Sequence, residues 1–169
     1  MKIATQTSPE LTQLAKLIQD IPIDMLTTVE ADGAQARRPM TAHEIDAQDA
    51  LGFFTDLHYS KVDHLRAVNL SFVDGDQGAY VSLSGHGEID TDPARIQSLW
   101  TVYAKPWFSD GPDSINLALL KFIPDTADYW EGPSSEMAGA SGLIASLISG
   151  KPVAMGEHGS HSAFSASTP

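Results

Sequence analysis

The sequence predicts a mainly β protein, in which about six strands form an antiparallel barrel or sandwich with short helices packed outside. Its strand-like segments follow one another as adjacent pairs joined by turn residues, a pattern that disfavours a parallel, doubly wound sheet. The chain has 169 residues, of which 42% are hydrophobic, so one domain can bury a full core. We therefore expect a single domain over residues 1–150, followed by a tail.

The first third of the chain predicts a helix and then a strand pair. Ser8 can cap a helix and Pro9 suits its first position, and apolar residues then recur at helical spacing to Ile18. Residues 23–45 read as two strands around Asp32-Gly33, a pair of residues favoured in tight hairpin turns.

Residues 50–68, ALGFFTDLHYSKVDHLRAV, predict a short buried strand and then a short helix. Ser60 can cap this helix, with Asp63 three residues later as in a capping box. Lys61 would then lie in the first helical turn, where a positive charge opposes the helix dipole. A bound phosphate would reverse this penalty, because the amide groups of the turn and the lysine could share one anion. The alternative is that Lys61 is a solvated surface residue and that Ser60 only caps the helix.

The remaining segments complete the predicted sheet. Residues 70–90 read as a second strand pair around a turn at 74–78, with the period-two alternation of a half-buried strand near its end. Asp92 and Pro93 begin a helix with Ile96, Leu99, Trp100 and Tyr103 as its apolar stripe. Residues 113–122 are predicted to be helical, 126–132 to close the sheet and 134–150 to form a weak helix. From 151 to 169, Gly, Ser, Ala and His dominate without periodicity, which indicates a flexible tail.

The composition argues against several classes of partner and site. A net charge of −12 disfavours nucleic acids and anionic membranes, because both need a basic surface. No apolar run approaches the roughly 18 residues that span a bilayer, and the first residues lack the apolar region of a signal peptide. The absence of cysteine excludes disulfides and thiolate chemistry. We expect a cytoplasmic protein with a small, local positive pocket.

The few basic residues indicate where such a pocket lies. Arg37 and Arg38 are on the strand that precedes residues 50–68, and adjacent strand residues point to opposite faces, so one of the two should face the pocket. With Thr55, Ser60 and Lys61 that arginine could form a phosphate cradle.

A set of motifs then gives the chain a family resemblance. MLTTVEADG, RRPM, FFTD…SKV, YVSLSG, LW…KPWFSDGPD…LALLKF and DYWEGPSS occur in this order between about residues 12 and 135. The set resembles the general stress protein 26 group of the pyridoxamine 5′-phosphate oxidase-like, FMN-binding split-barrel family. The resemblance implies a six-stranded antiparallel split β-barrel with peripheral helices, which forms a homodimer with FMN at the subunit interface.

The resemblance also assigns residues to the cofactor. Arg38 matches the arginine that approaches FMN, and Pro39 and Met40 match residues that line the flavin through their backbone. Thr55, preceded by Phe54, matches the residue beside the flavin and its ribityl phosphate, and Ser60 and Lys61 match the phosphate ligands. Trp107 and Trp130 match aromatic residues near the flavin, for which a packing role is the alternative. If Lys61 holds the phosphate, Lys61→Ala weakens FMN binding by about 1–3 kcal/mol.

The chain departs from true pyridoxamine phosphate oxidases, which carry a C-terminal motif of arginine and histidine for the substrate. No arginine follows Arg95 here, so pyridoxine phosphate is not the expected substrate. We expect an FMN-dependent oxidoreductase that uses NAD(P)H or a small molecule. The alternatives are a flavin carrier or sensor without turnover, and a stress-related interaction protein that has lost the flavin. His43, followed by Glu44, could instead ligate a metal or haem, although a polar strand residue is the simpler interpretation.

Overall fold

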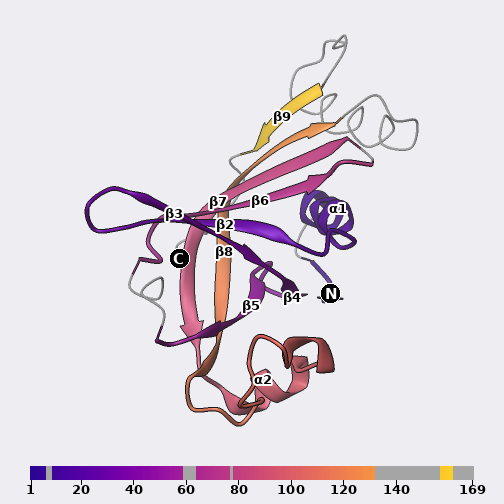
Figure 1. Ribbon diagram of the computed structural model, residues 1–169. Helices are drawn as coiled ribbons and strands as arrows, with labels where there is room; N and C mark the ends of the chain where they lie inside the picture. The colour runs from indigo at the N-terminus through magenta and orange to yellow at the C-terminus, as the bar shows by residue number, and fades with distance from the viewer. Residues whose placement is uncertain (7–8, 59–63, 77, 132–156, 162–169) are drawn as a thin grey trace, which may run out of the picture.

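A single curled β-sheet dominates the computed structural model, which describes residues 1–6, 9–58, 64–76, 78–131 and 157–161 (Figure 1). One helix packs near the N-terminal strand and a second, with its following loop, covers the other end of the sheet (Figure 1). The elements in chain order are β1 (Lys2–Ile3), α1 (Pro9–Ile18), β2 (Asp24–Val29), β3 (Gln35–Met40), β4 (Ala42–Ile45), β5 (Leu51–Asp56), β6 (Val68–Asp74), β7 (Ala79–Asp90), α2 (Pro93–Leu99), the 3₁₀ turn η2 (Val102–Ala104), β8 (Leu117–Glu131) and β9 (Glu157–His161).

The strand order shows that the barrel is split. The strands pair in the order β1-β4-β5-β8-β7-β6-β2-β3, and β9 pairs with β8. β3 ends this order, yet only Thr41 separates it along the chain from β4, which lies near the other end. No ladder joins β3 to β4 in the part of the chain that the structure describes. The sheet therefore curls until β3 and β4, which are joined along the chain through Thr41, meet at a corner. No described hydrogen-bonded ladder joins the two strands there.

Two hydrophobic clusters hold this arrangement. The main cluster lies inside the curl and includes Leu26 of β2, Phe53 of β5, Phe72 of β6 and Phe122 of β8, all at most 1% exposed. Ile18 of α1 packs into the same cluster. Strands from both ends of the order share one core, so burial of these side chains drives the curling. A smaller cluster lies on the outer face, where Ile96 and Leu99 of α2 cover Phe54.

The two predicted hairpins are confirmed. β2 and β3 pair around the turn at Asp32-Gly33, where Gly33 has a φ of 84° and the backbone N–H of Ala34 donates to Asp32 Oδ1 at 2.9 Å. β6 and β7 pair around the turn at 74–78. The first predicted helix and the helix from Pro93 are also present, but α2 ends at Leu99 and Tyr103 of the predicted stripe is exposed on η2.

Several predicted elements were wrong. Residues 113–122 are not helical, because Leu117–Phe122 begin β8 and are buried between β5 and β7; an apolar run of this length does not distinguish a buried strand from a helix. The predicted helix at 60–68 does not extend over its described part, where 64–67 are irregular and Val68 begins β6. The predicted weak helix at 134–150 lies outside the described residues.

The strand count also differs from the six-stranded prediction. The described residues form nine strands, and β1 runs parallel to β4 in a sheet whose other described pairs are antiparallel. Residues 157–161, within the stretch predicted to be a flexible tail, form β9 along 127–131 of β8. β5 covers only 117–122 on that side of β8, so β8 offers unpaired backbone groups to β9. Such pairing needs no hydrophobic periodicity, and for this reason composition did not predict it.

The close contact of β7 and β8 at Gly85 gives a first prediction. A Cβ atom on Gly85 would lie 2.1 Å from the backbone oxygen of Ile123, where the ladder shifts register. Gly85→Ala is expected to lower the free energy of unfolding by about 3 kcal/mol, because backbone atoms must move apart. Urea unfolding measures the change. Gly75→Ala is the matched control, since no atom lies within 4 Å of its Cβ position; equal effects of the two substitutions would contradict the expectation.

Candidate functional site

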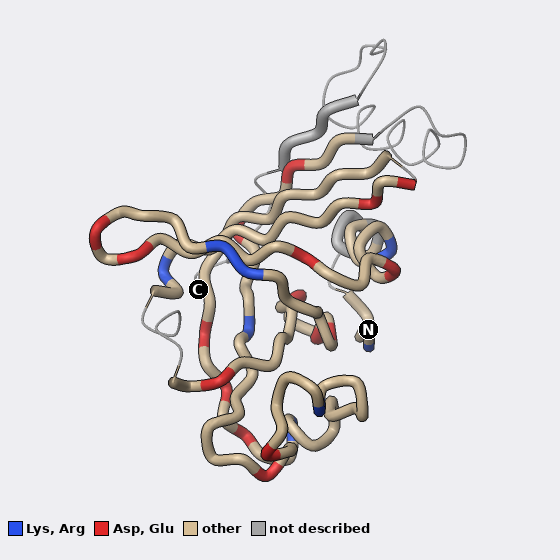
Figure 2. Tube along the Cα trace, viewed as in Figure 1, with Lys and Arg blue, Asp and Glu red and all other residues tan. Residues whose placement is uncertain are grey.

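The two consecutive arginines of β3 have different surroundings. Arg38 pairs across the ladder with Leu26, whose side chain is in the core, and it is half-buried. Arg37 is exposed on the opposite face and its guanidinium donates to Gln35 Oε1. Lysine and arginine are few on the described chain, and the pair stands out on β3 (Figure 2). Arg38 is thus the arginine on the inward face, as the alternation of strand residues requires.

Arg38 is a half-buried cation that has no counter-ion in the part of the chain that the structure describes. Among the described residues its guanidinium has neither a hydrogen-bond nor an ion-pair partner. Removing an arginine partly from water costs free energy unless an anion or acceptor compensates for the loss of hydration. The position therefore suits an anionic or hydrogen-bonding ligand.

The end of β5 holds Phe54 and Thr55, which point to opposite faces of their strand. Phe54 joins the outer cluster, whereas Thr55 follows the inward Phe53 by two residues. Thr55 is 1% exposed, and its Oγ1 has no hydrogen-bond partner among the described residues. A buried hydroxyl without a partner is uncommon in folded proteins. After the Arg38 guanidinium, the Thr55 hydroxyl is the second polar group of the candidate site that has no partner among the described residues.

Connectivity brings the ends of β3 and β5 towards the same corner. Ala42 pairs with Phe53, so residues beyond Phe53 in β5 extend past the start of β4 towards the end of β3. Residues 59–63, which include Ser60 and Lys61, lie outside the described part of the chain. They connect the end of β5 to His64, whose Nε2 lies 3.3 Å from Glu30 Oε2, beside the end of β2.

The two predicted tryptophans lie on different parts of the chain, and Trp130 is the one that is far from this corner along its strand. Trp107 follows η2, is 82% exposed, and precedes Phe108, which packs on Phe54. Trp130 is on β8, paired with Tyr80 and 41% exposed. Thr55 pairs with Ala118 at the other end of β8. At about 3.3 Å per residue, the strand from 118 to 130 measures about 40 Å, so the structure does not bring Trp130 to the Thr55 end of its own chain.

Asp24, a buried carboxyl on β2, was not predicted. It is 3% exposed and pairs with Met40 at the end of β3, and no described residue hydrogen-bonds its Oδ1. Burial raises the pKa of Asp24 to about 8, because the protein interior disfavours the charged form. Asp24 alternates in phase with Leu26 and Thr28, a period-two signal that could have placed it on the inward face.

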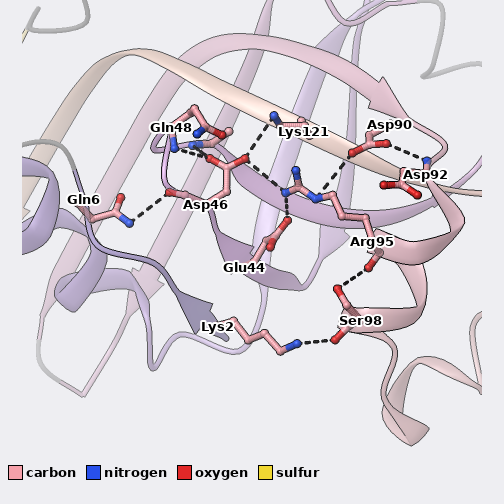
Figure 3. A network of polar contacts seen from close by, with 11 residues as sticks. Lys2, Gln6, Glu44, Asp46, Gln48, Asp90, Asp92, Arg95, Ser98 and Lys121 are labelled. Atoms are coloured by element: carbon pink, nitrogen blue, oxygen red, sulfur yellow. Dashed lines mark hydrogen bonds and ion pairs between the residues drawn. The ribbon is translucent and has the colours of Figure 1, made fainter.

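An ion network joins α2 to the barrel (Figure 3). The Arg95 guanidinium donates to Glu44 of β4, lies 3.4 Å from Asp46 Oδ2 and 3.7 Å from Asp90 Oδ2, and Lys121 Nζ lies 3.3 Å from Asp46 Oδ2. On the same side, Lys2 donates to the backbone oxygen of Ser98 at the end of α2. The network fixes α2 against β4, on the outer face of the sheet.

Asp46 is the most strongly held acid of this network. Burial alone would raise its pKa, but backbone N–H groups of Ala50 and Gln48 and the Lys121 ammonium outweigh burial and lower the pKa. The two bases therefore neutralise the acids that face them. Over the described residues, no group of three or more histidine or acidic side chains could hold a metal ion.

His43 sits beside this network at an irregularity of β4. Ala42 pairs with Phe53 and Glu44 with Gly52, so His43 is an extra residue in the ladder, a β-bulge. Its ring contacts Phe54, with the ring centroids 4.4 Å apart. Burial, together with the positive N-terminus, lowers the pKa of His43 to about 4. The histidine is therefore neutral at pH 7.

The fold and these side chains define a split-barrel protein with a candidate ligand site at the β3–β5 corner. The comparisons with known proteins agree with this class. The model of the family described as pyridoxamine 5′-phosphate oxidase like matches residues 9–153, so the chain belongs to that family. The predicted family resemblance is confirmed.

Solved structures with this fold include general stress proteins. The general stress FMN/FAD binding protein of Xanthomonas citri is 32% identical, with a TM-score of 0.63 over 76% of this chain and 93% of that one. The General Stress Protein 26 of Bacillus anthracis str. Sterne is 22% identical, with a TM-score of 0.62 over 72% of this chain and 94% of that one, and supports the fold alone. Protein bli-3 of Neurospora crassa is 25% identical over 111 residues, 59% of this chain and about half (53%) of that protein.

No helix among the described residues is long and apolar enough to cross a membrane.

Proposed function

We propose that the protein is an FMN-binding split-barrel flavoprotein of the general stress type, and that FMN binds at the β3–β5 corner. The observation that carries the proposal is Arg38, a half-buried guanidinium without a partner among the described residues. Thr55 Oγ1, which is buried and finds no hydrogen-bond partner in the described part of the chain, supports it. The FMN/FAD binding relative from Xanthomonas citri supports flavin as the ligand class.

Within this proposal each residue has a physical role. Arg38 neutralises the anionic end of the cofactor and donates to it, and Thr55 donates one hydrogen bond. Ser60 and Lys61, which lie outside the described residues, are proposed as the further phosphate ligands. The backbone of Pro39 and Met40 lines the flavin, while Phe54, sealed by the outer cluster, supports the wall behind it. Trp107 would cover the ring at its exposed edge.

A homodimer with FMN at the subunit interface and a cytoplasmic location are parts of the same proposal. The dimer agrees with the position of Trp130, which is far from Thr55 along β8 and could meet a flavin only from a second copy. Sedimentation of the FMN-loaded protein tests this part: a monomer that retains FMN would exclude an interface site.

The proposed activity is flavin-dependent oxidoreduction, with NAD(P)H or a small molecule as reaction partner. Hydride or electron transfer is the chemistry that the flavin itself supplies, so the chain's residues need only bind and orient the reactants. The absence of arginine after Arg95 supports a substrate other than pyridoxine phosphate. Bleaching of bound flavin by NADH or NADPH favours the enzyme; flavin that neither nucleotide reduces favours a carrier or sensor.

The adjacent arginines allow a matched test of the site. Arg38→Gln is expected to weaken FMN binding about 10- to 100-fold, the loss for one charge-assisted hydrogen bond. Arg37→Gln removes the same charge one residue away on the exposed face and should leave the affinity within about twofold, because a surface charge acts weakly through solvent. Quenching of FMN fluorescence measures both dissociation constants. Equal losses in the two variants would place the anion elsewhere.

A further inference from the structure

The inference concerns the contact between Glu30 and His64, to which the proposed function assigns no role. His64 Nε2 lies 3.3 Å from Glu30 Oε2, and the two side chains are only 24% and 26% exposed. Pairs of fully exposed charges contribute little, because their side chains are mobile and water screens them. This contact is mostly withdrawn from water, so it can hold the two backbone segments that it joins.

Glu30 belongs to the hairpin that carries the proposed anion-binding arginine. It follows β2 directly and begins the turn to β3. Its backbone N–H donates to the oxygen of Ala34 at 2.8 Å, and its backbone oxygen accepts from the N–H of Gly33 at 2.9 Å. These two hydrogen bonds fix Glu30 at the base of the turn, and Arg38 lies on the strand that the turn begins.

His64 lies where the other part of the proposed phosphate site joins the core. It directly follows residues 59–63, which include the two further phosphate ligands proposed above and lie outside the described chain. The next residue, Leu65, is buried in the main cluster, and its backbone oxygen accepts from the N–H of Gly87 at 2.7 Å. The described contacts therefore fix the position at which residues 59–63 end.

The position at which residues 59–63 begin is also fixed. The backbone N–H of Leu57 donates to the oxygen of Asn116 at 2.9 Å. The backbone N–H of His58 donates to Asp56 Oδ1 at 2.8 Å. Five residues between two fixed points have fewer conformations to lose on binding than a chain with one free end. Such pre-organisation raises affinity, because less entropy is lost when the ligand binds.

The charge of Glu30 separates a positioning role from a purely electrostatic one. A carboxylate beside a phosphate site repels the anion, so on charge alone the loss of Glu30 would strengthen the binding of FMN. If Glu30 instead holds His64 in place, its loss weakens that binding. The two roles predict changes of opposite sign.

We propose that Glu30 is a positioning residue for the phosphate group of FMN, which acts by holding His64, and with it the end of residues 59–63, against the hairpin that carries Arg38. The inference rests on the proposed function, because it takes FMN as the ligand and residues 59–63 as phosphate ligands. Its effect is specific to the phosphate and does not extend to the flavin ring.

The dissociation constants of FMN and riboflavin test the proposal, because riboflavin lacks only the phosphate. Quenching of flavin fluorescence by the full-length protein measures both. The native protein is expected to prefer FMN. In Glu30→Ala we expect FMN binding to weaken about 3- to 10-fold, as for the loss of one pre-ordered side chain, and riboflavin binding to stay within about twofold.

Asp125→Ala is the matched control. It removes the same charge from a second acid–imidazole pair, in which His86 Nδ1 lies 3.4 Å from Asp125 Oδ2 on β7 and β8. Both affinities should stay within about twofold of the native values, because this pair adjoins neither the hairpin turn nor residues 59–63.

Variants of His64 test whether Glu30 acts through it. His64→Ala should weaken FMN binding as Glu30→Ala does, so it also decides the matter if Glu30→Ala does not fold. The double variant should lose no more than either single variant, because both remove one contact. His64→Gln keeps a side-chain N–H donor for Glu30 and is expected to retain most of the preference for FMN.

The outcomes separate this inference from the proposed function. Tighter or unchanged FMN binding in Glu30→Ala overturns the inference and leaves the proposed function standing. An equal loss for FMN and riboflavin does the same, because the pair would then support the fold as a whole. Equal native affinities for the two flavins overturn the inference and the phosphate assignment. A native protein that binds no FMN overturns the inference and the proposed function together.

Discussion

The free energy of unfolding of the Asp24→Asn variant, taken relative to that of the native protein, is expected to be much higher at pH 8 than at pH 4. The folded protein holds Asp24 neutral, because burial raises its pKa from 3.8 to about 8. The unfolded chain releases this proton near pH 4. Native stability from this group is therefore fully present below about pH 4 and is lost as the pH rises towards 8.

The expected size follows from the same shift. Each pKa unit is worth 1.36 kcal/mol, so the penalty accumulated between pH 4 and pH 8 is on the order of 5 kcal/mol. Asparagine has nearly the same shape and does not titrate, so the free energy of unfolding of the variant lacks this dependence on pH. The test is the pH dependence of the difference between the two proteins, since the buried amide brings a hydrogen-bonding cost of its own.

Urea unfolding at half-unit steps from pH 4 to pH 8 measures the difference. Asp20→Asn, on the exposed loop after α1, is the control and should follow the native curve. Parallel curves for Asp24→Asn and the native protein would show that Asp24 is ionised in the folded state, paired with a cation that the described residues do not show.

Phe54→Ala is expected to lower the free energy of unfolding by about 3–5 kcal/mol, the usual cost of removing a buried aromatic ring. Phe54 is 4% exposed, and the rings of His43, Trp100 and Phe108 lie around it with centroid distances of 4.4, 5.6 and 5.9 Å. Ring neighbours of this kind cannot collapse readily into the cavity. The loss should also loosen the contact between α2 and the outer face of β5.

Chemical unfolding gives the free energy, and limited proteolysis between α2 and β8 reports the local loosening. Val73→Ala serves as the control, because Val73 is exposed on β6 and its truncation should cost less than about 0.5 kcal/mol. A loss below about 1 kcal/mol in Phe54→Ala would mean that α2 is held by the Arg95 network and not by this cluster.

Local signals predicted the parts of the fold that depend on local chemistry. The Asp32-Gly33 turn and the proline at the start of α2 impose backbone geometry on their neighbours, and both were correctly placed. Leu117–Phe122 were misassigned because their burial on both faces depends on β5 and β7, which are distant in sequence. β1 and β9 depend on free strand edges elsewhere, so no pattern in their own residues indicates them.

The candidate site likewise contains residues that local sequence signals predicted and residues whose position depends on strands distant in the sequence. Strand alternation predicted that one of two arginines faces inward, and Arg38 does. The phosphate loop with Ser60 and Lys61 stays a prediction, since it lies outside the described residues. His43 gained its position from a bulge, which depends on the register against β5 and has no signature in residues 42–44. The period-two alternation of Asp24 with Leu26 did indicate that Asp24 faces inward. The raised pKa of Asp24 could not be predicted in this way, because it results from burial in the folded structure.

The visible absorption spectrum of the purified full-length protein, after incubation with FMN and removal of the excess, tests the central claim most directly. The account predicts retained flavin bands at about one FMN per chain, the stoichiometry of a dimer with two interface sites. The bands should persist in Arg37→Gln and be lost or much reduced in Arg38→Gln. A protein that retains no flavin, or that retains it equally in the two variants, would contradict the assignment of the flavin site to Arg38.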